Sequence, residues 1–126
     1  MKLALAIIFW SLLYGCTPCP AMDSERAVQA VIGEAAGQTF AEKLAVACAL
    51  RNRGTLAGVR GIRNQRMIQS EPPRIWIDAR EAWAQSATND VTHGATHWES
   101  DQFPAPAWSR GMTLTAHIGK FKFFKP

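Results

Sequence analysis

The spacing of apolar residues predicts a first helix from Asp23 or Ser24 to about Ala36. Inside this stretch apolar side chains recur at intervals of three and four residues, which puts them on one face of a helix. The apolar face consists of Ala27, Val28, Val31, Ile32 and Ala35. Gly37 follows, and because glycine is common just beyond the end of a helix, we expect the helix to stop there.

A second helix is predicted to follow and to end near Arg53. It opens with TFAE, residues 39–42, in which a hydroxyl is followed three residues later by a glutamate, as in a capping box. Basic residues in the last turn, with Gly54 just beyond it, are typical of a helix end. Cys48 lies on the apolar face of this helix, so we expect a buried thiol. The sequence leaves open whether it pairs with Cys19.

Glycines, prolines and arginines in residues 54–72 predict a long loop, with a short helical turn around Gln65 to Ile68. Pro72-Pro73 then opens a predicted third helix, RIWIDAREAWAQSA. The face expected to pack on the other helices carries Trp76, Ala79, Trp83 and Ala87.

The last third of the chain has a different pattern. After a turn at Asn89-Asp90, the stretches VTHGATHWES and FKFFKP are rich in β-branched and aromatic residues. They predict two or three antiparallel strands, joined by the proline-containing loop 104–108. Helices first and strands last predict a small single α+β domain, with N-terminal helices followed by a short antiparallel β-sheet.

The N-terminus has the pattern of an export signal. Lys2 precedes the apolar run 3–14, which is shorter than the about 20 residues that a membrane-spanning helix needs. Residues 1–21 are therefore predicted to be a signal peptide, and a buried N-terminal strand or helix is the alternative. Cys16 follows a Leu-Tyr-Gly sequence, which resembles a lipoprotein cleavage site. The competing interpretation is ordinary cleavage after Ala21.

The remaining chain, residues 22–126, is long enough for one domain. Its basic character, a formal net charge of +4 over the whole sequence, favours a polyanionic partner such as nucleic acid, anionic lipid or an acidic wall polymer. Export argues against nucleic acid. We therefore expect a protein of the periplasm or cell envelope, with possible attachment to the membrane through lipid on Cys16.

Glu34 is unusual because it has no basic residue one helical turn away on either side, where surface glutamates commonly find one. Those four positions hold Ala30, Val31, Gly37 and Gln38. An acid beside an apolar stripe at the negative end of a helix is disfavoured as an anion, which suits proton donation to a leaving oxygen. An ordinary residue at the edge of the stripe, reaching into water or binding loop backbone, explains the position as well.

Two separated segments carry a family pattern. In VIGEAAGQTFAEKLAVACALRNRG a Gly-Glu-Ala motif precedes an Ala/Val-rich helix that ends in Asn-Arg. NDVTHGATHWES and PAWSRGMTLTAHIGKFKFFKP follow in the same order. Together, over about residues 26–125, they resemble the SleB-type cell wall hydrolases, which include spore cortex-lytic enzymes and many phage proteins.

The resemblance implies cleavage of the peptidoglycan glycan strand between N-acetylmuramic acid and N-acetylglucosamine, with Glu34 as the catalytic glutamate. It further implies a lysozyme-like or lytic-transglycosylase-like mechanism. In such a mechanism one carboxyl protonates the glycosidic oxygen and the sugar's own 6-hydroxyl attacks, without the second carboxylate that most glycosidases use. If the reaction is instead hydrolysis, Glu99 or Asp90 is the expected partner.

The segment that includes His97 is expected to bind the substrate. The predicted contacts are Thr96, His97, Trp98 and Glu99, with Trp98 stacking on a sugar ring. His93 and His97 are not expected to share a metal ion, because four residues on a strand span about 13 Å and the metalloprotease pattern fails at Gly94. No metal and no cofactor are expected.

The chain also departs from the family. Phe121 and Phe124 occupy the places where the family's closing strand usually carries a histidine and a tyrosine. If those groups bind sugar or tune the acid, activity is altered. The alternative function is therefore a non-catalytic peptidoglycan-binding lipoprotein that keeps the fold.

Overall fold

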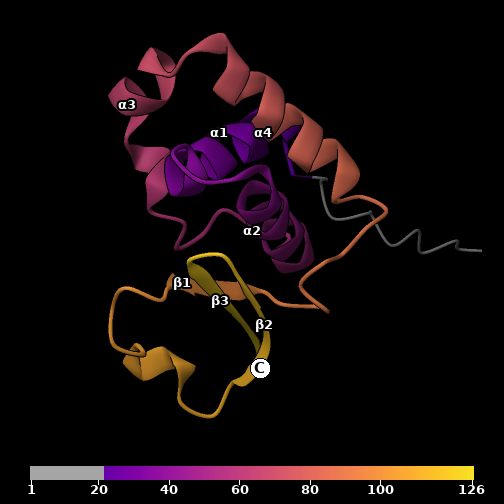
Figure 1. The fold of residues 1–126 in the computed structure, drawn as a ribbon, viewed down its shortest axis with the longest axis vertical. Helices are drawn as coiled ribbons and strands as arrows, with labels where there is room; N and C mark the ends of the chain where they lie inside the picture. Colours follow the sequence, from indigo (N-terminus) through magenta and orange to yellow (C-terminus); the bar gives the residue numbers. More distant parts are fainter. Residues whose placement is uncertain (1–21) are drawn as a thin grey trace, which may run out of the picture.

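A layer of helices packs on a small antiparallel sheet in the computed structural model, which describes residues 22–126 (Figure 1). The helices are α1 (Ser24–Ala35), α2 (Phe40–Arg53), α3 (Gln65–Ser70) and α4 (Pro73–Gln85), with the 3₁₀ turn η1 (Gly61–Arg63) before α3. The strands are β1 (His97–Ser100), β2 (Thr113–Ile118) and β3 (Phe121–Lys125), with the 3₁₀ turn η2 (Ala107–Ser109) before β2. The predicted α+β architecture, helices first and sheet last, is confirmed.

The predicted signal peptide, residues 1–21, lies outside the described residues, and so do Cys16 and Cys19. In the part of the chain that follows, no helix is long and apolar enough to cross a membrane.

Helix α1 begins and ends within a residue of the predicted bounds. Asp23 caps its start, because Oδ1 accepts a hydrogen bond from the Arg26 backbone N–H at 3.0 Å. At the other end the capping residue is Ala36 in a right-handed conformation, with its N–H donated to the Ile32 carbonyl. The predicted end near Ala36, with Gly37 just beyond it, is confirmed, but Gly37 does not take the left-handed conformation usual for a glycine in that place. The chain leaves the helix without a left-handed residue, so no glycine is required there.

Helix α2 carries both predicted end signals. The Thr39 hydroxyl accepts a hydrogen bond from the Glu42 N–H, and the Glu42 carboxylate accepts one from the Thr39 N–H, so the capping box is formed. Gly54 ends the helix with φ 73°, a left-handed conformation that favours glycine. Cys48 is buried as predicted, and burial raises the pKa of its thiol, which donates to the Asn89 carbonyl.

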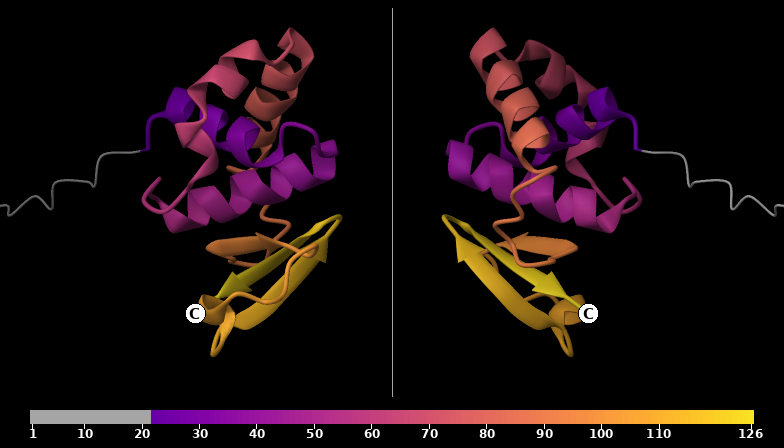
Figure 2. Two further views of the ribbon diagram at one scale, coloured as in Figure 1. Left: turned by 90° about the vertical axis from the view of Figure 1, so that its left-hand side faces the viewer. Right: turned by 90° about the vertical axis from the view of Figure 1, so that its right-hand side faces the viewer.

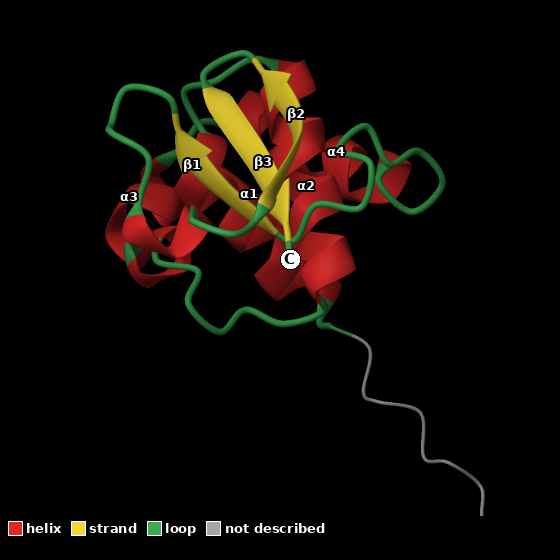
Figure 3. Cartoon of the chain, turned by 90° about the horizontal axis from the view of Figure 1, so that it is seen from below, coloured by secondary structure: helices red, strands yellow, loops and turns green. Residues whose placement is uncertain are grey.

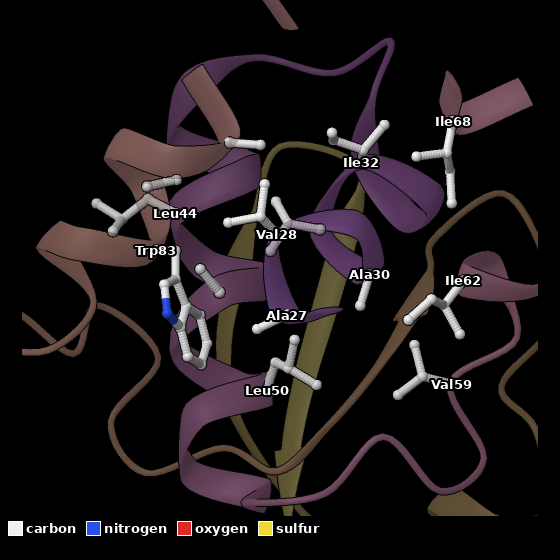
Figure 4. Close-up of a cluster of buried hydrophobic side chains, with 14 of the residues drawn as sticks. Ala27, Val28, Ala30, Ile32, Leu44, Leu50, Val59, Ile62, Ile68 and Trp83 are labelled. Carbon is white, nitrogen blue, oxygen red and sulfur yellow. The ribbon is translucent and has the colours of Figure 1, made fainter. Parts of the chain in front are cut away.

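The apolar face of α1 is the centre of the helical core. Val28 and Ile32 pack between residues of α2 and α4 and the segment 59–68 (Figure 4). The other large buried members of this cluster are Val31, Leu44, Leu50, Val59, Ile62, Ile68, Ile75 and Trp83. The predicted apolar stripe of α1 is thus the surface on which the other helices assemble.

Helix α4 is shorter than its sequence pattern. Pro73 occupies its first turn as expected, and Trp83 and Ala79 are buried. The helix ends at Gln85, so Ala87 is exposed and does not continue the packing face, which corrects the prediction. Trp76 is only partly buried, and Arg80 lies over its ring at 5.2 Å from the centroid.

The sheet has the order β1-β3-β2, with both pairs antiparallel. Phe121 and Phe123 of β3 pack on Ala45, Val46 and Ala49 of α2, so the central strand is fixed to that helix. Figure 2 shows α2 lying directly over the sheet, and Figure 3 shows β3 between its two partners. This packing holds the sheet, formed by the C-terminal third of the chain, against α2.

The first strand is shorter than VTHGATHWES suggests. Residues 91–94 form turns, and His93 and Gly94 have φ values of 55° and 87° that a strand does not adopt. Strand β1 starts only at His97. The turn brings β1 against α2.

A buried carboxylate joins the hairpin of β2 and β3 to the start of α2. Glu42, which is 4% exposed, accepts a hydrogen bond from the Lys120 N–H through Oε2 at 3.3 Å. Gly119 has φ 55°, and a Cβ atom there would lie 2.4 Å from the Glu42 carboxyl carbon. Glycine is thus required at this turn by both conformation and space.

Candidate active site

Glu34 is held from two directions in the last turn of α1. Its Oε1 accepts a hydrogen bond from the Gly61 backbone N–H at 2.7 Å, and its Oε2 accepts one from the Trp98 indole N–H at 3.2 Å. One donor comes from η1 and the other from β1, which is 64 residues along the chain. The carboxyl is therefore fixed at the junction of the helical layer and the sheet.

Two glycines allow the Gly61 N–H to reach Glu34. A Cβ atom on Gly33 would lie 2.3 Å from the Gly61 carbonyl carbon, and a Cβ atom on Gly61 would lie 2.4 Å from the Gly33 carbonyl carbon. Real Cβ atoms do not approach backbone this closely, so η1 can lie against α1 only with glycine at both positions.

A cleft of about 710 Å³ opens beside Glu34. The residues that line it, here called the cleft residues, are Glu34, Arg53, Gly58, Val59, Arg60, His97, Trp98, Glu99, Pro106 and Trp108. The volume is typical of a site for a small molecule or a few sugar rings. The structure thus brings Glu34 together with three of the four predicted substrate contacts: His97, Trp98 and Glu99.

Thr96 is not a cleft residue, but it supports one. Its hydroxyl lies 2.8 Å from Nδ1 of His97. Burial lowers the pKa of His97, and the positive charge of Arg53 lowers it further. Because Nδ1 of the neutral ring is hydrogen-bonded to Thr96, Nε2 is the ring atom that remains to form a hydrogen bond with a ligand.

Three aromatic side chains, His97, Trp108 and Phe124, pack together at one wall of the cleft. Trp108, which is 40% exposed, lies 5.4 Å from the His97 ring, and Phe124 meets Trp108 edge-on at 5.6 Å. Phe124, at the place where the family usually has a tyrosine, thus packs against Trp108. Phe121, at the place of the family's histidine, is part of the core against α2. An exposed indole supported in this way suits stacking on a sugar ring.

The two acids named as candidate partners of Glu34 have different surroundings. Glu99 is a cleft residue, and its Oε1 accepts a hydrogen bond from the Ser100 N–H. Asp90 is not a cleft residue, and both of its oxygens are occupied. They accept hydrogen bonds from the Thr92 N–H and hydroxyl, the Gly94 N–H and the Asn52 amide. Of these two acids, only Glu99 is placed to share a ligand with Glu34.

Asp90 is expected to stabilise the turn in a pH-dependent way. Burial alone would raise its pKa, but hydrogen bonds from Thr92, Asn52 and the loop backbone more than offset this, so the pKa lies below the ordinary value of 3.8. A lowered pKa means that the stabilisation is fully present above the unfolded-state pKa and is lost as pH falls through the folded-state pKa. We expect Asp90→Ala to lower the free energy of unfolding by about 1 kcal/mol at pH 7.

Urea denaturation at several pH values tests this expectation. The difference between wild type and Asp90→Ala should narrow below about pH 4, where the unfolded aspartate becomes protonated. A difference that stays constant down to pH 2 would contradict the assigned role.

Several residues of the site do not follow from the sequence patterns. The cleft residue Arg60 and the Glu34 donor Gly61 lie in a stretch predicted only as loop, and Arg53 is explained locally as a helix-end charge. The glycines at positions 33 and 61 are the one feature of the sequence that could have indicated the contact between η1 and Glu34, since two glycines far apart in sequence can mark a close backbone approach. Trp98 is the tryptophan that the sequence favours as a sugar contact, and Trp108 is a second tryptophan that lines the cleft.

Comparison with solved structures defines the class of this domain. No protein-family model and no curated protein matches the sequence. The catalytic domain of the Bacillus cereus SleB protein superposes with a TM-score of 0.65 and 25% identity, covering 89% of this chain and 99% of that domain. The catalytic domain of the germination-specific lytic transglycosylase SleB from Bacillus anthracis gives a TM-score of 0.63 and 23% identity, covering 85% and 100%.

The chain is therefore a small α+β domain with the fold of a bacterial lytic transglycosylase's catalytic domain. More particularly, it resembles SleB catalytic domains over most of its length, which confirms the resemblance predicted from its two motifs.

Proposed function

We propose that this protein cleaves the glycan strand of peptidoglycan, as a muramidase or lytic transglycosylase, with Glu34 as the single general acid and base. One observation carries the proposal. Glu34 lies in a cleft with His97, Trp98 and Glu99, which belong to the second of the two segments that resemble the family. The likeness to SleB catalytic domains, one of which is described as a lytic transglycosylase, supports it.

In this mechanism Glu34 first acts as an acid. Its carboxyl gives a proton to the oxygen that bridges two sugars, and the bond from that oxygen to the anomeric carbon breaks. The ring left behind has oxocarbenium character. Its own 6-hydroxyl then bonds to the anomeric carbon and passes its proton to the Glu34 carboxylate. The product carries a 1,6-anhydro ring, and Glu34 is again protonated for the next turnover.

The fixed position of Glu34 suits this double role. Proton transfer requires the carboxyl to stay within hydrogen-bond reach of first the bridging oxygen and then the 6-hydroxyl. The Gly61 N–H and the Trp98 indole restrict its rotation, at 2.7 and 3.2 Å. If water attacks instead, Glu99 is the acid in the cleft that can activate it.

The alternative is a wall-binding lipoprotein without turnover. It rests on Phe121 and Phe124, which replace a histidine and a tyrosine of the family and remove two polar groups. Under either proposal the protein acts outside the cytoplasm, directed by the predicted signal in residues 1–21, and lipid on Cys16 would attach it to the membrane.

Digestion of purified sacculi separates the two proposals. Mass spectrometry of the released fragments should find muramic ends that lack one water, the mark of the anhydro product. Reducing ends without anhydro ends would indicate hydrolysis and assign a role to Glu99. Unchanged glycan, with the protein retained on sedimented sacculi, would support the wall-binding alternative and contradict catalysis.

A further inference from the structure

Arg53 is a cation placed in the cleft with most of its hydrogen-bonding capacity unused. It is the last residue of α2, and its guanidinium lies 5.9 Å from the centre of the Trp98 ring. Of the five N–H groups of an arginine, one is donated to a described residue, from Nη2 to the Ala57 carbonyl at 2.7 Å. The remaining donors are available to a ligand.

The loop after α2 holds this guanidinium in place. Gly58 has φ 79°, and a Cβ atom there would lie 2.8 Å from Nη2 of Arg53, so the loop passes directly beside the side chain. The Ala57 carbonyl fixes one edge of the guanidinium and Trp98 lies next to it. An arginine fixed before binding loses less conformational entropy when it takes a ligand.

No acid of the described residues forms a close ion pair with Arg53. Between residues 22 and 126 the close pairs of acidic and basic side chains are Arg80 with Glu25 and His117 with Asp101. Arg60, a second cleft residue, is likewise outside these pairs. The cleft therefore holds two arginines that form no close ion pair with its two carboxylates, Glu34 and Glu99.

Arg51, two residues before Arg53, shows the contrast. Its Nε donates to the Ser86 hydroxyl at 2.9 Å, its Nη2 donates to the Trp83 carbonyl at 2.6 Å, and the guanidinium lies 3.8 Å from the Trp83 ring centre. Arg51 is thus committed to the packing of α2 on α4, whereas Arg53 faces the ligand space.

We propose that Arg53, assisted by Arg60, forms a subsite for a carboxylate carried by the muramic residue of the glycan strand. This inference rests on the proposed function and adds the chemical group by which the cleft recognises the strand. Muramic acid differs from N-acetylglucosamine by a lactyl ether, whose carboxyl is free in peptide-stripped strands and joined to an acidic stem peptide in intact ones. A guanidinium binds a carboxylate through two parallel N–H donors, so the cleft selects acidic wall glycan over neutral amino-sugar polymers.

The test compares three substrates: intact strands, strands freed of stem peptides by an amidase, and freed strands whose lactyl carboxyls have been converted to neutral amides. Wild type should cut the acidic strands with a kcat/KM about tenfold above the neutral strands, mainly through KM. Arg53→Gln should lose this preference. Arg63→Gln removes an equal charge from an exposed residue outside the cleft and should keep it.

Binding of the same strands to Glu34→Gln provides a readout that does not need turnover. A preference for acidic strands in that binding, absent from the Glu34→Gln, Arg53→Gln double variant, supports the subsite even if wild type cuts nothing and the proposed function fails. Equal cutting and equal binding of acidic and neutral strands overturn the subsite and leave the proposed function intact. A preference for intact over stripped strands assigns the carboxylate to the stem peptide, and the reverse assigns it to the lactyl group.

Arg53→Lys is a second variant, for the case that Arg53→Gln fails to fold. It keeps the charge at the end of α2 but not the forked donors, so it should fold like wild type and retain only part of the preference. Full retention of the preference in a folded Arg53→Gln variant overturns the proposal.

Discussion

Glu34→Gln is expected to reduce the rate of glycan-strand cleavage by about 10²–10⁴-fold, the usual contribution of a positioned general acid and base. The amide cannot give up a proton to the bridging oxygen, and it cannot take one from the 6-hydroxyl. Release of soluble fragments from purified sacculi measures the rate. The loss should appear in kcat, because the variant keeps the shape of the cleft.

The variant needs two controls. Glutamine retains one acceptor for the Gly61 and Trp98 donors, so a modest loss of stability, about 1–3 kcal/mol, is expected and is checked by thermal unfolding. Glu99→Gln changes charge equally in the same cleft and should cost far less activity if transglycosylation is the reaction. Cleavage at the normal rate by folded Glu34→Gln contradicts the assignment of Glu34.

Gly33→Ala should have the largest effect on stability. The new Cβ atom would lie 2.3 Å from the Gly61 carbonyl carbon and oxygen, and backbone on both sides leaves no side chain to move aside. Separating η1 from α1 is expected to lower the free energy of unfolding by about 3 kcal/mol or more. It would also withdraw the Gly61 N–H from Glu34, so the folded fraction should have reduced activity.

Gly37→Ala is the matched control for this substitution. Gly37 is exposed, its φ is not positive, and a Cβ atom there meets nothing within 4 Å. Alanine should be neutral or stabilising by up to about 1 kcal/mol, since it restricts the unfolded chain. Chemical denaturation of both variants tests the pair. Equal midpoints for Gly33→Ala and Gly37→Ala would show that the backbone contact contributes nothing.

The features that sequence predicts well are local ones. The capping box of α2 depends only on residues 39–42, and the left-handed end of the helix depends only on the backbone freedom of Gly54, so both are formed as expected. The end of α1 before Gly37 is also formed as expected, although Gly37 is not left-handed. Ala87 was wrongly placed on the packing face because the end of α4 depends on how the following loop returns to the core, and no pattern within the helix records that path.

The candidate site is predicted only in part, because it is assembled from distant segments. Glu34 and residues 97–99 could be named from two motifs, since each motif is continuous in sequence. Arg60 and Trp108 reach the cleft through the segments 54–60 and 101–112, whose paths follow from tertiary packing, and Arg53 lines it from the end of α2. Arg51 and Arg53 illustrate the limit. They are alike in sequence, yet one is packed on Trp83 and the other lies in the cleft.

The link from Glu42 to Lys120 has a consequence for how the molecule unfolds. A sheet of three short strands is barely stable alone, and this one is held to α2 by Phe123 and by that buried carboxylate. Opening the sheet therefore exposes the helical layer as well. Amide protons of β3 should exchange with solvent only when the whole domain opens, while those of residues 101–112 exchange early. Heating should accordingly produce a single cooperative transition.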